Sequence, residues 1–120
     1  MLVYVNKEFL QKAKAQVSIN DRGFRYGDGI FETVAVYSGV MYQWKLHLDR
    51  LKAGLESLKI NFNSEELEEI CSKLISKNNI TDGFIRIQIS RGTGSIGYLP
   101  KKNITPTLVI ETIIRKKPKK

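Results

Sequence analysis

The order of hydrophobic periodicities along the chain is the feature that most constrains its fold. Apolar residues recur at the three- and four-residue spacing of amphipathic helices from Leu46 to about Lys59, and again from about Ser64 to Asn78. On both sides of this helical part, short runs rich in β-branched and aromatic residues predict strands. The sequence indicates strands at residues 2–5, 16–19, 30–37, 40–43, 84–90 and 107–114. Strands segregated from helices in this way are typical of an α+β fold, here with a largely antiparallel sheet and two amphipathic helices.

Turn and cap signals set the expected limits of these elements. The turn-forming residues Asn20–Gly23 and Gly27–Gly29 bracket a short connecting segment at Phe24–Tyr26. The second helix is expected to begin after Asn63 or Ser64. If Asn63 is the cap, Glu66 is placed to complete a capping box.

The chain is expected to form one domain over residues 1–114, followed by a basic tail or the start of an interdomain linker at residues 115–120. Its 120 residues are 42% hydrophobic and 27% charged, which is typical of a globular protein. The formal net charge of +8 would suit a nucleic-acid partner, but the last six residues carry five of these charges. Because short charged tails are usually solvated, no nucleic-acid partner is expected.

Neither a membrane partner nor a disulfide is expected. No apolar run approaches the roughly 20 residues that a membrane-spanning helix needs, and the N-terminus lacks the regions of a signal peptide. A cytoplasmic location follows by default. The single cysteine, Cys71, falls in the apolar stripe of the second helix and has no partner at metal-ligand spacing. It is therefore expected to be a buried core residue.

The first of three informative segments runs from Asp21 to Glu32 and combines three glycines with aromatic side chains. Glycines permit a positive φ or a close approach of two backbones, and aromatic rings can line a pocket. On its own, this segment is more typical of a tight structural turn than of a binding site.

The second segment, His47–Leu51, places His47 and Arg50 three residues apart and therefore on one face of a helix. The planar fork of an arginine near a helix start suits two parallel hydrogen bonds to a phosphate, although an ordinary surface Arg-Asp face is the alternative. His47 is the only histidine and has no metal-ligand spacing, so no metal site is expected.

The third segment, Phe84–Tyr98, is a strand that carries Arg86 on its polar side and then enters the glycine-rich stretch Gly92–Gly97. A buried arginine beside such a loop fits recognition of a substrate carboxylate. The stretch lacks the Lys-Ser/Thr ending and the following helix of a P-loop, so a nucleotide site is not favoured.

In this order and spacing, the three segments resemble the class IV aminotransferase family of fold-type IV pyridoxal-phosphate enzymes, over nearly the whole chain. The family pattern Asp-Arg-Gly-aromatic-x-x-Gly-Asp-Gly-x-aromatic-Glu matches Asp21–Glu32, and His-x-x-Arg-Leu matches His47–Leu51. The resemblance implies the small N-terminal domain of such an enzyme. It also implies that Arg50 binds the phosphate of pyridoxal 5'-phosphate, and that Tyr26 and Phe31 line the substrate pocket.

Within the family, the branched-chain aminotransferases are the favoured subgroup, and they transfer an amino group between an amino acid and a 2-oxo acid. They have an additional arginine on the first central strand, which falls at Ala35 here. D-Amino-acid aminotransferases carry a loop arginine and histidine that fall at Ile96 and Tyr98, which disfavours that activity. The substrate-binding residues that the resemblance implies are Tyr26, Phe31, Arg86, Ile96, Gly97 and Tyr98.

Aminodeoxychorismate lyase, which releases pyruvate to give 4-aminobenzoate, is the alternative activity. Such lyases resemble this chain at Phe31–Thr33 and at Ser90–Tyr98, where the sequence reads Ser-Arg-Gly-Thr-Gly-Ser-Ile-Gly-Tyr. A basic binding domain without catalytic activity is the second alternative, and it would leave Arg50 and Arg86 facing solvent.

The resemblance also sets what this chain is not expected to do alone. The lysine that forms a Schiff base with the cofactor lies in the second domain of these enzymes, so the chain is expected to contain no catalytic residue and to be inactive by itself. The lysines at residues 116–120 are not expected to replace it. The resemblance further implies a homodimer that binds an amino acid or aminodeoxychorismate, with the Gly92–Gly97 loop reaching the neighbouring subunit's active site.

Overall fold

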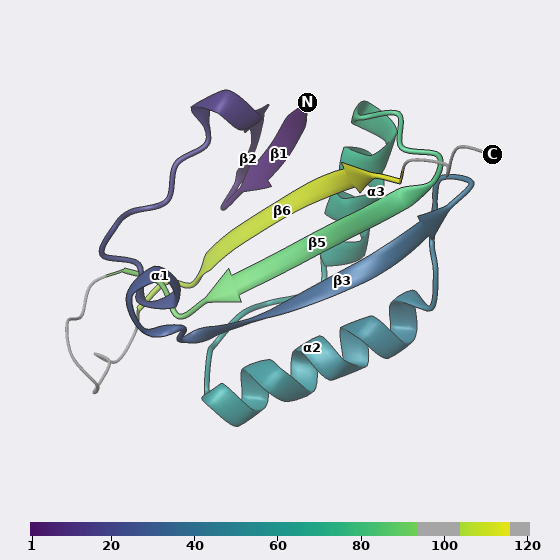
Figure 1. The fold of residues 1–120 in the computed structure, drawn as a ribbon. Coiled ribbons are helices and arrows are strands. Elements are labelled where there is room, and N and C mark those ends of the chain that lie inside the picture. Colours follow the sequence, from purple (N-terminus) through teal and green to yellow (C-terminus); the bar gives the residue numbers. More distant parts are fainter. Residues whose placement is uncertain (94–103, 116–120) are drawn as a thin grey trace.

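The computed structural model describes residues 1–93 and 104–115, which form one sheet flanked by helices (Figure 1). In the described part of the chain, six strands pair in the order β2-β1-β6-β5-β3-β4, and every neighbouring pair is antiparallel. The strands are β1 Leu2–Val5, β2 Glu8–Gln11, β3 Gly29–Tyr37, β4 Val40–Met41, β5 Gly83–Ser90 and β6 Thr107–Ile114. The helices are α1 Arg22–Tyr26, α2 Trp44–Leu58 and α3 Leu67–Lys77, with a 3-10 turn η1 at Lys12–Lys14. The α+β fold with an antiparallel sheet is confirmed.

The core lies between one face of the sheet and the two longer helices. Along β5, the alternating side chains Ile85, Ile87 and Ile89 are buried and point to that face. Helix α2 packs alongside β3, while α3 contacts β1 and β6 and lies behind β5 and β6 in Figure 1. The side chains that α2 and α3 contribute to the core are Leu51, Leu55, Leu67, Cys71, Leu74 and Ile75.

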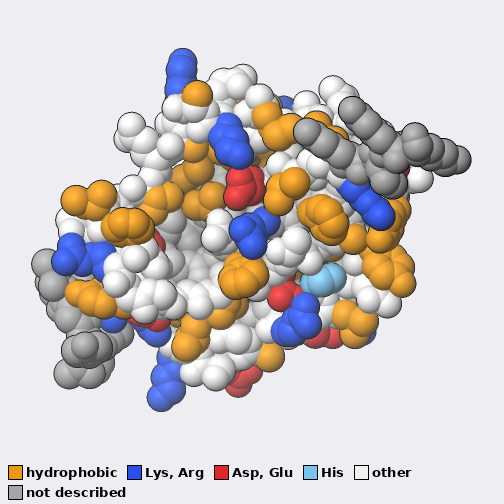
Figure 2. Space-filling model, in the orientation of Figure 1, with side chains coloured by type: hydrophobic (Ala, Val, Ile, Leu, Met, Phe, Trp, Pro, Cys, Tyr) orange, Lys and Arg blue, Asp and Glu red, His pale blue; other side chains and the backbone are white. Residues whose placement is uncertain are grey.

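The opposite face of the sheet is open over much of its area. Figure 2 shows this face, where hydrophobic side chains are interspersed with Lys and Arg side chains. Phe31 on β3 and Ile113 on β6 are both exposed large hydrophobic residues of this face. A site for a ligand or for another part of a protein can therefore form on this face.

Cys71 confirms the expectation drawn from the helical stripe, because its side chain has no exposed surface. Burial, together with the negative charge of Glu68, raises the pKa of the thiol to about 12. The residue is therefore a neutral core side chain and not a reactive thiolate.

The expected strand at residues 16–19 is wrong. Asn6 and Lys7 form a two-residue turn, with Asn6 at a φ of 57°, so the chain pairs back at once and β2 occupies Glu8–Gln11. Residues 16–19 form no strand, and Ile19 is 72% exposed. The two-residue turn sets the register of the hairpin, so β1 pairs with β2 and not with residues 16–19.

Two local expectations at helix starts also differ from the structure. Phe24–Tyr26 does not merely connect two turns but belongs to helix α1, which ends at Gly27 in the left-handed conformation. The Asn63 capping box is absent, because Asn63 Oδ1 accepts a hydrogen bond from the Glu65 backbone N–H at 3.0 Å. This Asx turn uses the side chain before the helix begins, and α3 starts only at Leu67.

The helices of residues 1–93 and 104–115 are all too short or too polar to cross a membrane.

Candidate functional site

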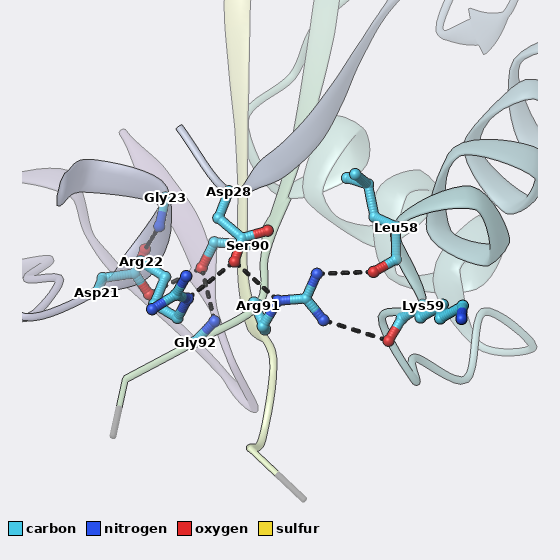
Figure 3. A network of polar contacts seen from close by, with 9 residues as sticks. All are labelled: Asp21, Arg22, Gly23, Asp28, Leu58, Lys59, Ser90, Arg91 and Gly92. Carbon is cyan, nitrogen blue, oxygen red and sulfur yellow. Dashed lines mark hydrogen bonds and ion pairs between the residues drawn. The ribbon is translucent and has the colours of Figure 1, made fainter. Parts of the chain in front are cut away.

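Asp21 fixes the start of α1 to the ends of two strands. Its carboxylate is buried, and Oδ2 accepts from the Gly23 backbone N–H at 2.9 Å, which caps the helix (Figure 3). Oδ1 accepts from Ser90 Oγ at 2.8 Å and from Thr107 Oγ1 at 2.7 Å. The first residue of the Asp21–Glu32 segment therefore has a structural role.

Asp28 lies between two arginines at the centre of Figure 3. Arg22 Nε donates to Asp28 Oδ2 at 2.8 Å, and Arg91 Nε donates to the same oxygen at 2.7 Å. Arg91 also donates to the Leu58 carbonyl at 2.6 Å, at the C-terminal end of α2. Burial alone would raise the pKa of Asp28, but the hydrogen bonds and charges of Arg91 and Arg22 outweigh it and lower the pKa. This network joins α1, β5 and α2.

Two glycines of the same segment are required by close packing. A Cβ on Gly23 would lie 2.7 Å from Ser90 Cβ, and one on Gly29 would lie 2.6 Å from the Ile89 carbonyl oxygen. These close contacts support the interpretation of Asp21–Gly29 as a tight structural turn. The segment also forms one wall of a pocket beside α1.

A pocket of about 480 Å³ opens beside α1 on the open face of the sheet. Phe31, a predicted substrate-binding residue, lines it and is 59% exposed. Tyr26, the other predicted aromatic, is not among the lining residues, and its ring lies 4.8 Å from the Arg22 guanidinium carbon. The lining residues are Val17, Asp21, Gly23, Phe24, Gly27, Gly29, Ile30, Phe31, Gln88, Ile89, Ser90, Thr107 and Val109.

Arg86 lies next to this pocket on β5. Its guanidinium carbon is 5.2 Å from the centre of the Phe31 ring, a cation–π contact. Its Nε is buried and has no hydrogen-bond partner among the described residues. Glu111, which faces Arg86 across β5 and β6, is 3.4 Å from Lys12 Nζ instead. A buried donor without an acceptor is costly, so Arg86 is suited to receive an anionic ligand.

Arg50 and His47 meet at the buried carboxylate of Glu32, the last residue of the family pattern, for which the sequence predicted no role. Arg50 Nε lies 2.8 Å and 3.2 Å from the two carboxylate oxygens of Glu32, and His47 Nδ1 lies 3.1 Å from Oε1. The Glu32 side chain is 9% exposed, whereas that of Arg50 is 71% exposed. The predicted shared face of His47 and Arg50 is confirmed.

A sequence signal for Glu32 existed. The residue stands at an inward position of a strand, in alternation with the buried Val34 and Val36. A glutamate is almost never fully buried unless it is paired, so this position required a cationic partner from a facing element. The helix residue that supplies the partner lies 18 positions away and cannot be identified from the strand alone.

The predicted residues therefore form two groups on different faces of β3. Phe31 and Glu32 are consecutive in the strand and point to opposite faces. Phe31 and Arg86 belong to the open face with the pocket, and Arg50 pairs with Glu32 on the side where α2 packs. The predicted residues Ile96, Gly97 and Tyr98 lie outside the described residues.

Comparison with known proteins assigns this arrangement to a family. The family model for amino-transferase class IV matches residues 29–119. The chain belongs to the class IV aminotransferase family. The match begins at β3 and includes α2 and β5, so it covers the three elements that carry Phe31, Arg50 and Arg86.

Curated relatives within this family carry more than one name. The chain is 37% identical over 110 residues, 90% of its length, to a protein of Methanocaldococcus jannaschii assigned as a branched-chain-amino-acid aminotransferase. It is 36% identical over 108 residues, 88% of its length, to a D-alanine aminotransferase of Listeria monocytogenes. These matches cover 38% and 36% of the relatives, so the chain spans less than two fifths of their length.

Solved structures share the fold. A 4-amino-4-deoxychorismate lyase from Pseudomonas aeruginosa matches 96% of this chain and 40% of its own, with a TM-score of 0.82 and 30% identity. A branched-chain amino acid aminotransferase of Escherichia coli matches 95% of this chain and 40% of its own, with a TM-score of 0.89 and 24% identity. The fold is that of the N-terminal domain of such enzymes.

Proposed function

We propose that the chain is the N-terminal part of a pyridoxal-phosphate-dependent aminotransferase that moves an amino group between a branched-chain-like amino acid and a 2-oxo acid. The proposal rests on the exposed guanidinium of Arg50, whose Nε donates to the buried carboxylate of Glu32. Membership of the class IV aminotransferase family supports it.

The donor set at Arg50 fits a phosphate. Glu32 occupies only Nε, which leaves the Nη1 and Nη2 edge of an exposed guanidinium for a ligand. Two parallel charge-assisted bonds from one arginine match the geometry of phosphate oxygens. Arg50 would thus hold the cofactor phosphate, and pyridoxal phosphate when bound supplies an electron sink that stabilises negative charge at the amino acid's Cα.

The open face of the sheet supplies groups that suit an amino-acid substrate. Arg86, whose Nε is buried without a partner, would bind the substrate carboxylate beside the Phe31 ring. The neighbouring pocket is lined by apolar residues such as Val17 and Val109, which suit an aliphatic side chain. The proposal retains Tyr26, Ile96, Gly97 and Tyr98 as substrate-binding residues on the family resemblance.

Aminodeoxychorismate lyase is the second candidate activity. The segment Ser90–Tyr98 resembles the loop of these lyases, and the Pseudomonas aeruginosa lyase structure is 30% identical to this chain. D-Alanine transamination is the third activity to test, because several relatives carry that name. We rank it lower because Ile96 and Tyr98 replace the loop arginine and histidine expected for D-amino acids.

A homodimer and the need for a lysine from a second domain complete the proposal, and they rest on the family resemblance. The cytoplasmic location expected by default from the sequence is proposed with them. The competing proposal of a basic binding domain requires Arg50 and Arg86 to be ordinary surface cations. The burial of Arg86 Nε argues against it, whereas the Arg50 side chain, which is 71% exposed, meets that requirement.

The test uses the complete gene product with pyridoxal phosphate and three separate assays. L-Leucine, L-isoleucine or L-valine is supplied with 2-oxoglutarate, D-alanine with 2-oxoglutarate, and aminodeoxychorismate alone. We expect glutamate from the L-amino acids, and 4-aminobenzoate from the third assay would favour the lyase instead. A protein that shows no cofactor absorbance, and that binds polyanions in a salt-sensitive manner, would overturn the enzymatic proposal.

A further inference from the structure

Glu32 is a buried carboxylate with two cationic or polar neighbours from another element. It lies on β3, its side chain is 9% exposed, and both neighbours, His47 and Arg50, come from α2. A buried carboxylate needs hydrogen-bond donors, and these two satisfy it. The pairing is asymmetric, because the Arg50 side chain is 71% exposed and therefore presents its outer edge to solvent.

The hydrogen-bond inventory fixes which atoms remain for a ligand. A carboxylate only accepts, so His47 Nδ1 at 3.1 Å from Glu32 Oε1 must carry the proton. His47 Nδ1 then cannot accept from Arg50 Nη2, and their 3.5 Å separation is a contact without a hydrogen bond. In the described part of the chain, Nη1 and Nη2 of Arg50 are consequently left with donor capacity.

We propose that Glu32 is the positioning residue of the phosphate site, a role that rests on the proposed function of Arg50. Glu32 holds Arg50 through Nε, so that the outer Nη edge keeps one orientation toward the ligand phosphate. His47 Nδ1 contacts Oε1, the oxygen that Arg50 Nε also contacts at 2.8 Å, and this second bond helps to hold the Glu32 carboxylate in place. An arginine on an exposed helix face without this anchor would sample many rotamers, and each binding event would have to order it.

The phosphate group itself provides the test. The Kd values of the complete gene product are measured for pyridoxal 5'-phosphate and for pyridoxal, which lacks the phosphate. Glu32→Gln is expected to weaken pyridoxal-phosphate binding by roughly 10-fold, the loss of one charge-assisted contact, and to change pyridoxal binding by less than about 2-fold. A merely structural glutamate would affect both ligands equally.

Controls separate this inference from the function on which it rests. Glu69→Gln makes the same change in an exposed ion pair with Lys73 on α3, and it should alter neither Kd. Arg50→Lys should also weaken pyridoxal phosphate selectively, and Glu32→Gln should add little to it. If Arg50→Lys is selective but Glu32→Gln affects both ligands equally or neither, the positioning role is wrong and the phosphate site stands. If Arg50→Lys does not weaken pyridoxal phosphate more than pyridoxal, the proposed role of Arg50 in binding the phosphate is itself wrong.

If Glu32→Gln does not fold, Glu32→Asp, which keeps the negative charge, is measured in its place. Glu32→Asp shortens the side chain by one methylene group and withdraws the carboxylate from Arg50 Nε. It is expected to show the same selective loss for pyridoxal phosphate, smaller than that of Glu32→Gln. Equal loss for both ligands in Glu32→Asp would overturn the positioning role.

Discussion

Replacing Asp28 by asparagine should markedly destabilise the fold. Asp28 Oδ2 accepts hydrogen bonds from Arg22 Nε at 2.8 Å and from Arg91 Nε at 2.7 Å. The side chains of Arg22, Asp28 and Arg91 are 4%, 14% and 17% exposed, so solvent screens these charges little. Asparagine keeps the shape but removes the negative charge that both largely buried guanidinium groups contact through Nε.

The expected magnitude follows from these contacts. Removing one partner of a buried ion pair costs about 3 to 5 kcal/mol, because the other charge stays buried. Asparagine retains one oxygen as acceptor, and Arg91 keeps its bonds to the Leu58 and Lys59 carbonyls. We therefore expect Asp28→Asn to lower the free energy of unfolding by about 2 to 3 kcal/mol.

Urea unfolding followed by the fluorescence of Trp44, the single tryptophan of the chain, measures this loss. Asp49→Asn is the matched control, because Asp49 is an exposed residue of α2, and the same change there should alter the free energy of unfolding by less than about 0.5 kcal/mol. Equal stability of Asp28→Asn and the parent chain would refute the claim that this network fixes α1 against β5 and α2.

The same aspartate predicts a difference in acid stability. The folded pKa of Asp28 is lowered below the ordinary 3.8, so its stabilising contribution is fully present above that value. The contribution is lost as the pH falls through the folded pKa. Between about pH 5 and about pH 2, the free energy of unfolding of the parent should therefore fall more steeply than that of Asp28→Asn.

Three further outcomes are expected. Arg86→Lys in the complete gene product should raise the KM for the amino acid by roughly 10-fold and leave the Kd of pyridoxal phosphate nearly unchanged, since a carboxylate contact is lost; equal KM values would contradict this. Gly29→Ala should lower the free energy of unfolding by about 1 to 3 kcal/mol, because its Cβ would lie 2.6 Å from the Ile89 carbonyl oxygen; urea unfolding at parental stability would contradict it. Cys71, with a pKa raised to about 12, should react with a thiol reagent at neutral pH only after unfolding, which absorbance kinetics with and without urea would show.

Long periodic segments were predictable because local pattern and tertiary packing agree in them. The strand expected at 107–114 is β6, and the alternation at Ile85, Ile87 and Ile89 correctly gave the buried face of β5. The strand expected at 16–19 failed because a two-residue turn at Asn6 and Lys7 decided the pairing. The capping box at Asn63 failed because that side chain forms an Asx turn instead.

The candidate site was predictable only in part, for a related reason. Helical spacing placed His47 and Arg50 on one face, but their partner Glu32 comes from a strand, and sequence spacing does not measure distances between elements. Arg86 was expected on the polar side of β5, yet its contact with the Phe31 ring depends on the register between β3 and β5. Asp28 likewise gains its role from Arg91, which is 63 positions away.

The Kd of pyridoxal phosphate for the complete gene product and for its Arg50→Lys variant tests the central claim most directly. Lysine keeps the positive charge but loses the fork that can form two parallel bonds. Losing one charge-assisted bond, worth about 1.5 to 3 kcal/mol, should weaken binding by roughly 10- to 150-fold while the melting temperature stays that of the parent. If the variant binds pyridoxal phosphate as tightly as the parent at equal thermal stability, Arg50 is an ordinary surface arginine and the proposed phosphate site is wrong.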